Sequence, residues 1–280
     1  MMIDILLNFA NIAGQYLKQQ RKNIKPILNK DTSVESLVTK SDLFVSDLFE
    51  KVIEDNFLKL NHIIIDEEKT TGYGNKVFDK INSSEYQFVI DPIDGTIQYA
   101  SGHPLYGISI GVYKNAKPYM GLIYLPDLDE LTYFDGVKAY LVQNAFSQAE
   151  KRTEILPGVK SSSPIIFGHP WLWNLSSDFS TSKALFIDYF SAVSQSFYTI
   201  TGKAKAYCMN LKLWDIAGTI PITDYLGMKI YNYENNKICN QISEEFFDTN
   251  MSTKGSYILC YPEDYEKIKS LVIPKKSDND

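Results

Sequence analysis

The sequence predicts a mixed α/β protein with N-terminal helices, a central antiparallel sheet and a second half that mixes strands and helices. Residues 3–22 carry apolar side chains at helical spacing, and a second helix is predicted from about Ser41 to Leu58. Residues 105–145 alternate between turn signals at 114–115, 126–127 and 135–136, which is typical of an antiparallel meander.

Each predicted N-terminal helix has an apolar stripe for burial. The stripe of the first comprises Ile5, Leu6, Phe9, Ile12, Ala13, Tyr16 and Leu17. Ser41 and Asp42 stand at the start of the second helix, whose stripe comprises Leu43, Val45, Leu48, Phe49, Val52 and Ile53. The polar residues 23–36 between the two helices are predicted to form a loop.

The remaining elements are shorter. Strands are predicted at 62–65, 86–90, 165–167, 204–208 and 257–260. Helices are predicted at 182–200 and 262–272, and residues 211–226 are predicted to be a loop that enters a helix near Trp214. The polar segment 147–163 marks a boundary between an N-terminal half, 1–150, and a C-terminal half, 151–280. We expect the last residues, 274–280, to be disordered.

Composition narrows the class of protein. The chain has 280 residues, 44% of them hydrophobic and 22% charged, which suits a globular protein with a sizeable core. A net charge of −6 and a pI near 5.2 argue against nucleic-acid binding through a basic surface. Three cysteines without paired spacing, and no apolar run long enough to cross a bilayer, predict a cytoplasmic protein without a membrane segment.

One motif directs the functional reading. The apolar strand ending at Ile90 runs directly into Asp91-Pro92-Ile93-Asp94-Gly95-Thr96. Two carboxylates at a strand end repel each other unless a cation lies between them, and oxygen ligands suit Mg²⁺ better than zinc. An Asp-rich surface turn is the alternative reading of this string taken alone.

Further acidic groups strengthen the metal-site reading. Asp42 stands at a helix start, Asp66-Glu67-Glu68 follow a strand, and Asp215 lies in Trp214-Asp215-Ile216-Ala217-Gly218. Together with Asp91 to Tyr99 and Leu37 to Asp42, this set resembles the inositol monophosphatase family. The family patterns are L-V-T-x-x-D, an E-E pair, D-P-[IL]-D-G-T-x-[NQ]-[FY] and W-D-x-A-[AG]. The resemblance covers residues 1 to about 270, in the expected order.

The resemblance implies a layered α-β-α-β-α sandwich, usually a homodimer, that hydrolyses a phosphate monoester by in-line attack of a metal-activated water. It implies that the N-terminal half carries most metal ligands and that the C-terminal half completes the active site. Two or three Mg²⁺ are expected as cofactors, and lithium is expected to inhibit. The first Mg²⁺ would be held by Glu67, Asp91 and the Ile93 carbonyl, and the second by Asp91, Asp94 and Asp215.

The resemblance also implies catalytic and substrate-binding roles. Thr96, hydrogen-bonded to Asp42, would help to deprotonate the water, with Glu67 as the third catalytic group. The Gly95 and Thr96 amides would bind phosphate oxygens. Independently, a phosphate dianion repels hydroxide, so two cations at the attacking and leaving oxygens would promote the reaction. Four carboxylates offset the charge of two Mg²⁺.

The departures from the family pattern concern the substrate. Cys208 stands where the family has an acidic residue that holds sugar hydroxyls, and a thiol does not accept such hydrogen bonds as a carboxylate does. Lys205 replaces another acidic residue, and Asp66 replaces a glycine. Substrate contacts are predicted from Gly95, Thr96, Asp215, Cys208 and Lys205.

Several alternatives remain open from the sequence. Lys203, Lys205 and Lys212 indicate either a second anionic group on the substrate or a solvated strand face. The first reading favours a 3′(2′),5′-bisphosphate nucleotidase or a sugar bisphosphatase. A regulatory or binding protein that retains the fold is the non-enzymatic alternative. The segment His169 to Trp173 is interpreted either as pocket lining or as buried aromatic packing.

Overall fold

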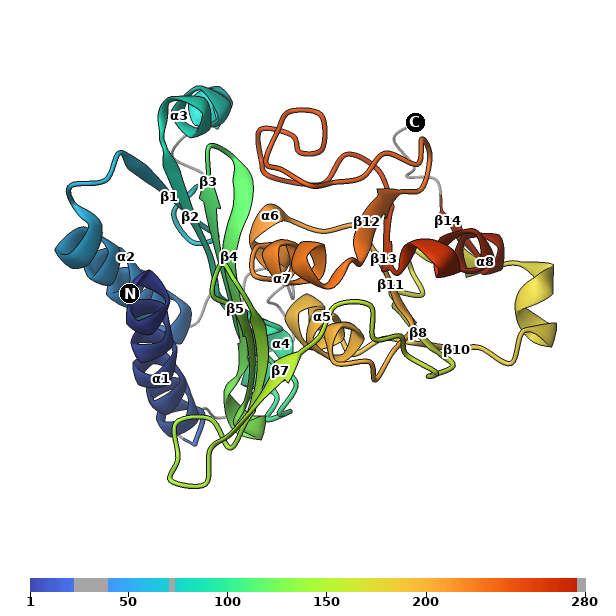
Figure 1. The fold of residues 1–280 in the computed structure, drawn as a ribbon, viewed down its shortest axis with the longest axis horizontal. Coiled ribbons are helices and arrows are strands. Elements are labelled where there is room, and N and C mark those ends of the chain that lie inside the picture. The colour runs from blue at the N-terminus through green and yellow to red at the C-terminus, as the bar shows by residue number, and fades with distance from the viewer. Residues whose placement is uncertain (23–39, 71–73, 276–280) are drawn as a thin grey trace, which may run out of the picture.

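The computed structural model describes residues 1–22, 40–70 and 74–275, in two sheets with helices on their faces (Figure 1). The larger sheet has seven strands that lie side by side in chain order. They are β1 (His62–Asp66), β2 (Tyr86–Asp94), β3 (Gly107–Lys114), β4 (Lys117–Leu125), β5 (Glu130–Phe134), β6 (Ala139–Gln143) and β7 (Lys151–Ile155). β1 runs parallel to β2 and every later pair is antiparallel, which confirms the predicted meander.

The smaller sheet lies in the C-terminal half and has the strand order β10-β8-β11-β13-β12. Its strands are β8 (Ile165–Gly168), β10 (Leu185–Ile187), β11 (Ala206–Met209), β12 (Lys229–Asn232) and β13 (Tyr257–Cys260). β10, β8 and β11 are parallel, and β13 pairs antiparallel with β11 and β12. A separate ribbon joins β9 (Trp173–Leu175) to β14 (Val272–Pro274).

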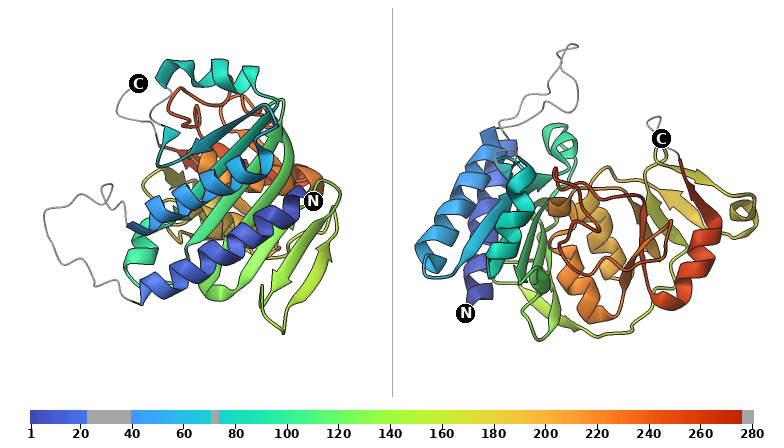
Figure 2. Two further views of the ribbon diagram at one scale, coloured as in Figure 1. Left: turned by 90° about the vertical axis from the view of Figure 1, so that its left-hand side faces the viewer. Right: turned by 90° about the horizontal axis from the view of Figure 1, so that it is seen from above.

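Helices form three layers around the two sheets. α1 (Met2–Arg21) and α2 (Lys40–Phe57) cover the outer face of the large sheet (Figure 2). α5 (Ala192–Ile200), α6 (Leu213–Ile216) and α7 (Thr219–Leu226) lie between the sheets, and α8 (Tyr265–Leu271) packs on the small sheet. Two short helices, α3 (Val77–Ser83) and α4 (Thr96–Ala100), flank β2 in sequence. This arrangement confirms the expected α-β-α-β-α sandwich.

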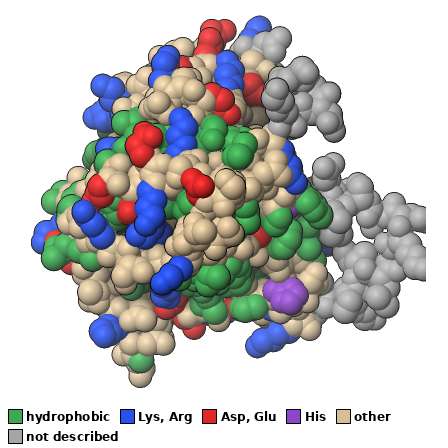
Figure 3. Space-filling view, turned by 90° about the vertical axis from the view of Figure 1, so that its right-hand side faces the viewer, with side chains coloured by type: hydrophobic (Ala, Val, Ile, Leu, Met, Phe, Trp, Pro, Cys, Tyr) green, Lys and Arg blue, Asp and Glu red, His purple; other side chains and the backbone are tan. Residues whose placement is uncertain are grey.

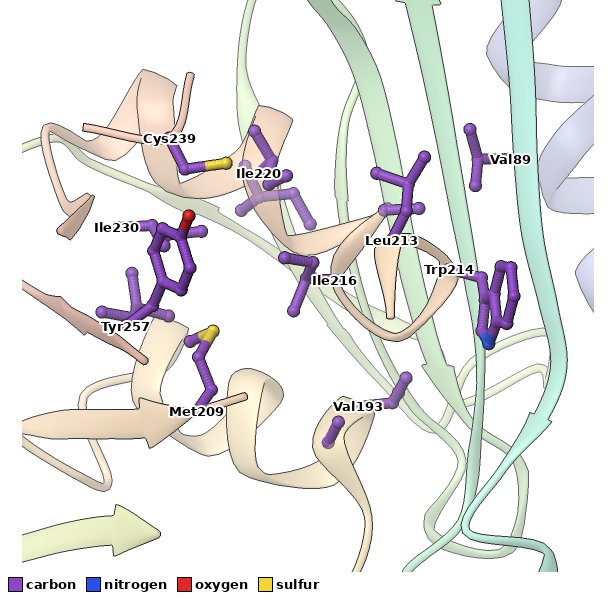
Figure 4. Packing of buried hydrophobic residues seen from close by; sticks show 14 of the residues in the cluster. Val89, Val193, Met209, Leu213, Trp214, Ile216, Ile220, Ile230, Cys239 and Tyr257 are labelled. Carbon is purple, nitrogen blue, oxygen red and sulfur yellow. The ribbon is translucent and has the colours of Figure 1, made fainter. Parts of the chain in front are cut away.

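Three apolar clusters correspond to these layers. One joins α1 and α2 to the large sheet, and another joins the small sheet to α8. The largest fills the space between the sheets, where Leu213, Trp214 and Ile216 of α6 lie among residues of both (Figure 4). The predicted division of the chain at residue 150 stays a prediction. β7 extends the large sheet past residue 150, and the central apolar cluster contains residues from both halves of the chain.

Some local predictions differ from the structure. The helix predicted over 182–200 is wrong in its first part, because residues 185–187 form β10 and the helix begins at Ala192. Phe190, with φ of 55°, has a left-handed backbone that ends any helix entering from the N-terminal side. The stripe of α2 is narrower than predicted, since Leu43 is 46% exposed. Residues 23–39 and 276–280, including Leu37, Val38 and Thr39, lie outside the described residues.

The junction between α6 and α7 makes a close backbone contact with the large sheet. The Gly218 N–H donates to Ser109 Oγ on β3 at 3.1 Å. A Cβ added at Gly218 would lie 2.3 Å from the Leu122 carbonyl oxygen on β4, although its φ of −71° is ordinary. Only glycine permits this approach without displacement of the backbone. The contact fixes where Asp215, on α6, stands relative to the large sheet.

We expect Gly218→Ala to lower the free energy of unfolding by about 3 kcal/mol, since the added methyl meets backbone oxygen rather than a movable side chain. Gly202→Ala is the control. Its Cβ meets nothing within 4 Å, so only the left-handed φ of 74° opposes it, at about 1 kcal/mol. Urea unfolding of both variants measures the difference. Equal losses would show that the close contact does not limit packing.

Candidate metal and substrate site

Three aspartates meet where β2 ends. Asp91 and Asp94 lie at the end of β2, and Asp215 lies on α6, which contacts β2 and β3. Residues three apart on a regular strand face opposite sides, but the pairing with β3 shifts register between Asp91 and Asp94. One carboxylate oxygen from each aspartate lies within 4.8 Å of the others. The structure therefore brings together three of the four predicted carboxylate ligands.

Glu67 supplies the fourth carboxylate from the neighbouring strand. It follows β1 directly, and β1 is parallel to β2, so both strand ends lie at the same edge. The Glu67 N–H donates to the Ile90 carbonyl at 3.4 Å, and the Glu67 carboxyl group interacts electrostatically with those of Asp91 and Asp215. Burial, followed by repulsion from Asp215, raises the pKa of Glu67 to about 8.

The cluster is electrostatically suited to a hard cation. Burial raises the pKa of Asp94 to about 6 and that of Asp215 to about 7, and it raises the pKa of Asp91 well above its ordinary value. Asp91 Oδ1 is buried and has no hydrogen-bond partner among the described residues. An unpaired buried carboxylate oxygen is costly, and four converging carboxylates are ligands that Mg²⁺ or Ca²⁺ accepts. The residues present therefore fit a bound metal ion.

Asp94 also anchors the middle layer. Its Oδ2 accepts hydrogen bonds from the Ser191 hydroxyl and, at 2.9 Å, from the Val193 N–H, while Oδ1 accepts from the Ala192 N–H at 3.2 Å. Ser191 caps α5 as well, accepting from the Ser194 N–H at 3.1 Å. The sequence does not indicate this bond, because nothing local shows which carboxylate the start of the helix meets.

The turn after Asp94 carries the predicted phosphate-binding groups. Gly95 has φ of 80° and precedes Thr96, the first residue of α4. The Thr96 hydroxyl donates to the Ile93 carbonyl at 3.1 Å. A carbonyl oxygen has two lone pairs, so this bond leaves Ile93 able to coordinate a cation as well. The roles of Gly95, Thr96 and Ile93 stay predictions.

Asp42 and the Asp66-Glu67-Glu68 turn lie next to the cluster. Asp42 is buried on α2, and burial, followed by repulsion from Asp42, raises the pKa of Glu68 to about 7. The expected Asp42–Thr96 hydrogen bond stays a prediction. Asp66 accepts from the Ser46 hydroxyl at 2.5 Å and the Glu68 N–H at 2.9 Å. The aspartate that replaces the family glycine therefore ties the turn to α2.

A cavity of about 260 Å³ opens beside the cluster. Its wall includes residues of β2, β11, α5 and α6, together with the segments after β8 and β10. The lining comprises Asp94, Ile97, His169, Leu172, Asp188, Phe190, Ser191, Ala192, Gln195, Tyr207, Cys208, Met209, Asn210, Leu211 and Asp215. His169 and Leu172 thus line the pocket, whereas Trp173 is buried in packing and Trp171 is 77% exposed. The segment 169–173 therefore contributes both to the pocket lining and to buried aromatic packing, as the two interpretations of its sequence predict.

The predicted substrate residues on and near β11 lie in different places. Cys208 lines the cavity but also belongs to the apolar cluster behind the small sheet, together with Cys260. Lys205 precedes β11 and approaches Asp264 at 3.4 Å, so the structure does not bring it to the cavity. Lys203 pairs with Glu130 at 3.4 Å. Lys212 lies next to the carboxylate cluster, and its backbone N–H donates to Asp215 Oδ2 at 2.8 Å.

Comparisons with known proteins agree with this geometry. The model of the inositol monophosphatase family matches residues 1–264. Inositol monophosphatase 3 of Solanum lycopersicum is 31% identical over 140 residues, covering 50% of this chain and 49% of the relative. The fructose-1,6-bisphosphatase/inositol-1-monophosphatase of Aquifex aeolicus is 32% identical over 143 residues, covering 48% and 49%. The chain thus spans about half the length of these curated relatives.

Solved structures share the whole fold. Inositol monophosphatase-II from Staphylococcus aureus superposes with a TM-score of 0.69 at 22% identity, covering 96% of this chain and 91% of that one. An IMPase/NADP phosphatase complexed with NADP and Ca²⁺ superposes with a TM-score of 0.72 at 18% identity, covering 96% and 93%. The match to the family model, the shared fold and the four converging carboxylates lead to one conclusion: the chain belongs to the inositol monophosphatase family.

Proposed function

We propose that the protein is a Mg²⁺-dependent phosphatase that hydrolyses a small phosphate monoester. The observation that carries this proposal is the cluster of Glu67, Asp91, Asp94 and Asp215, with a buried, unpartnered oxygen on Asp91, at the end of a cavity. Such a cluster is unfavourable without cations, and its ligand types suit Mg²⁺. Membership of the family supports the same activity.

The carboxylates divide between two proposed Mg²⁺ positions. Glu67, Asp91 and the Ile93 carbonyl would hold one ion, and Asp91, Asp94 and Asp215 would hold the other. When bound, two such cations supply positive charge at the attacking and leaving oxygens and lower the pKa of water. A third ion is compatible with the number of carboxylate oxygens. The protein's part is to keep these oxygens convergent and to exclude bulk water from them.

The remaining groups act on the substrate. The Gly95 and Thr96 N–H groups precede the first turn of α4 and would donate hydrogen bonds to phosphate oxygens. Thr96, oriented by its bond to Ile93 and aided by Asp42, would accept the proton of the attacking water. The leaving alcohol would occupy the cavity beyond Asp94 and Asp215.

A substrate with a second phosphate is less well supported. None of the described residues that line the cavity is a lysine or arginine, whereas Asp188 contributes a further carboxylate. On the face next to β10 and α8, basic side chains are interspersed with acidic and apolar ones (Figure 3). These observations favour the solvated-surface reading of the lysines over a bisphosphate site. The intact cluster also argues against a purely regulatory role.

Location and assembly belong to the same proposal. Among the helices of residues 1–22, 40–70 and 74–275, none is long and apolar enough to cross a membrane. We propose a cytoplasmic homodimer by likeness to the family, and light scattering of the purified protein measures the assembly.

We expect Asp91→Asn to lower the rate of phosphate release by at least about a hundredfold. Asp91 would ligate both metal ions, and the charge stabilisation that such ions supply contributes several kcal/mol to catalysis. The assay uses Mg²⁺ with inositol 1-phosphate, fructose 1,6-bisphosphate, adenosine 3′,5′-bisphosphate, histidinol phosphate and glycerol 2-phosphate. Asp91 is preferred to Asp94 for this test, since Asp94 also anchors α5.

The control for Asp91→Asn is Asp224→Asn, at a carboxylate that pairs with Lys229 on the surface. It should retain wild-type turnover. Full activity of Asp91→Asn, or no phosphate release by the wild type from any of these esters, would contradict the proposed function.

Stability of the metal-free protein should fall as pH rises. The pKa of Glu67 is raised to about 8 and that of Asp215 to about 7, against about 4 for carboxyl groups in an unfolded chain. Between these values the folded state binds more protons than the unfolded state, so the free energy of unfolding decreases with rising pH. Mg²⁺ replaces those protons. Its stabilising shift in Tm should therefore be larger at about pH 8 than at about pH 5.5.

Calorimetry of the chelated and the Mg²⁺-loaded protein measures this dependence. Asp91→Asn should flatten it, because one of the mutually repelling carboxylates is then neutral. A stabilisation by Mg²⁺ that is independent of pH would count against metal binding at this cluster.

Lithium should inhibit turnover at the second metal position. A small monovalent cation can occupy carboxylate oxygens there but supplies less charge to the leaving oxygen than Mg²⁺ does. The measurement is phosphate release against LiCl, with NaCl at equal ionic strength as the control. An equal response to the two salts would place this protein outside the lithium-sensitive members.

A further inference from the structure

A second cavity lies at the other edge of the small sheet, away from the metal cluster. β10, β8 and β11 are parallel, so the segments that precede them lie together at one edge and the segments that follow them lie at the opposite edge. Residues that follow β8 and β10 line the cavity beside the metal cluster, whereas residues that precede all three strands, together with α8, line this one. Its volume is about 160 Å³, and we call it the lysine cavity after Lys183, Lys205 and Lys267 in its wall.

The charge of the lysine cavity is opposite to that of the whole chain. Lys183 precedes β10, Lys205 precedes β11 and Lys267 lies on α8. None of the described residues in the wall is acidic, whereas the chain as a whole carries a net charge of −6. Lys205 Nζ lies 3.4 Å from Asp264 Oδ1, but Lys183 and Lys267 have no ion pair within the described part of the chain. Two uncompensated positive charges beside a third favour an anion in the cavity.

The uncharged part of the wall also suits an anion. The Ser163 hydroxyl accepts from the Ile165 N–H at 3.2 Å, and its own hydrogen has no acceptor among the residues that the structure describes. An ammonium group donates and cannot accept, and this hydroxyl can donate as well, so the polar groups match a ligand that only accepts. Ile166 and Ile268, each 1% exposed, line the same cavity. Apolar surface of this kind lowers the local dielectric and so strengthens the attraction between the lysines and an anion.

We propose that the lysine cavity binds a phosphate group, as free inorganic phosphate or as part of a small phosphorylated molecule. A phosphate group presents acceptor oxygens in several directions, and lysine binds phosphate as a point charge. A volume of 160 Å³ corresponds to about five water molecules at ~30 Å³ each, which is enough for one phosphate group. The site lies outside the proposed catalytic residues and does not depend on the phosphatase activity. Lys205, which the sequence predicts as a substrate contact, would bind a different anion here.

The backbone at Lys183 provides a way to separate binding from folding. Its φ of 59° lies in the left-handed region, which glycine adopts more easily than lysine does. The Lys183 side chain is exposed, so its removal costs little packing. Lys183→Gly should therefore leave Tm unchanged or raise it, while it removes one of the two uncompensated ammonium groups. A loss of phosphate binding in this variant would then not result from a loss of stability.

The test is calorimetric titration of the full chain with inorganic phosphate in EDTA, at an ionic strength held constant with NaCl. Without metal ions the four carboxylates of the metal cluster repel phosphate, so binding there does not contribute to the signal. The wild type should bind one phosphate, and sulfate should compete with it. The same binding event should persist when the titration is repeated with Mg²⁺ bound, because the lysine cavity contains no proposed metal ligand.

Two variants and a matched control assign the binding to the cavity. Lys267→Gln and Lys183→Gly should each raise the Kd for phosphate about threefold to tenfold, the effect expected when one exposed charged partner is lost. Lys59→Gln is the control, because it removes the same charge from an exposed lysine that lies beyond α2 and does not line the cavity. It should leave the Kd unchanged, and Tm values verify that each variant is folded.

Saturable phosphate binding in EDTA that both cavity variants weaken, and that Lys59→Gln does not, supports the site. No saturable binding by the wild type overturns it. Equal weakening in all three variants also overturns it, since that result would indicate a general effect of net charge. Titration with glycerol 2-phosphate distinguishes the two sources of the ligand. Tighter binding than that of inorganic phosphate assigns the site to a phosphorylated molecule, and equal or weaker binding assigns it to free phosphate.

Discussion

The cost of holding four carboxylates together, two of them buried and two half-buried, is the constraint on which the rest of the structure depends, because desolvation and then mutual repulsion disfavour their charged forms. The raised pKa values of Glu67, Asp94 and Asp215 show that the folded chain holds these groups where their charged forms are disfavoured. Packing elsewhere must offset this cost when no cation is bound. Two contacts hold α6 in place against the repulsion between Asp215 and the other carboxylates. They are the close approach of Gly218 to the backbone of β4 and the hydrogen bond from the Lys212 N–H to Asp215.

The ligands come from layers that are far apart in the sequence, so metal binding is coupled to the packing of the two sheets. Asp91 and Asp94 belong to the large sheet, whereas Asp215 belongs to the helical layer between the sheets. Asp94 links the large sheet to the helical layer, because its carboxylate also accepts hydrogen bonds from the first N–H groups of α5. A cation that draws the carboxylates together therefore also stabilises the contact between the sheet and the middle helices.

Sequence patterns predicted the parts of the fold whose cause is local. The meander, the N-terminal helices and the strand ending in Asp91 follow from periodicity and turn residues. The failures have tertiary causes. Residues 185–187 pair with β8, which the sequence does not reveal, and Leu43 is exposed because the sheet covers a narrower face of α2 than apolar residues occupy. The sequence predicts that Lys205 contacts the substrate, but the structure does not bring it to the cavity beside the metal cluster. The pairing of β11 with β8 and β13 decides which end of β11 lies near the carboxylates, and this pairing cannot be read from the sequence.

The substrate wall shows why a motif can be read correctly and still leave specificity open. The metal ligands lie within or beside short motifs, since a strand end and a helix start fix their geometry. The cavity wall instead gathers single residues from the segments after β8, β10 and β11, so its chemistry is not contained in any one stretch. The sequence shows Cys208 where an acidic residue is expected, which suggests a lost contact. In the folded chain Asp188 lines the same cavity, so a carboxylate is present on a different segment. The functional groups of the cavity wall are therefore found from the residues that line the folded cavity, and not from a single sequence position.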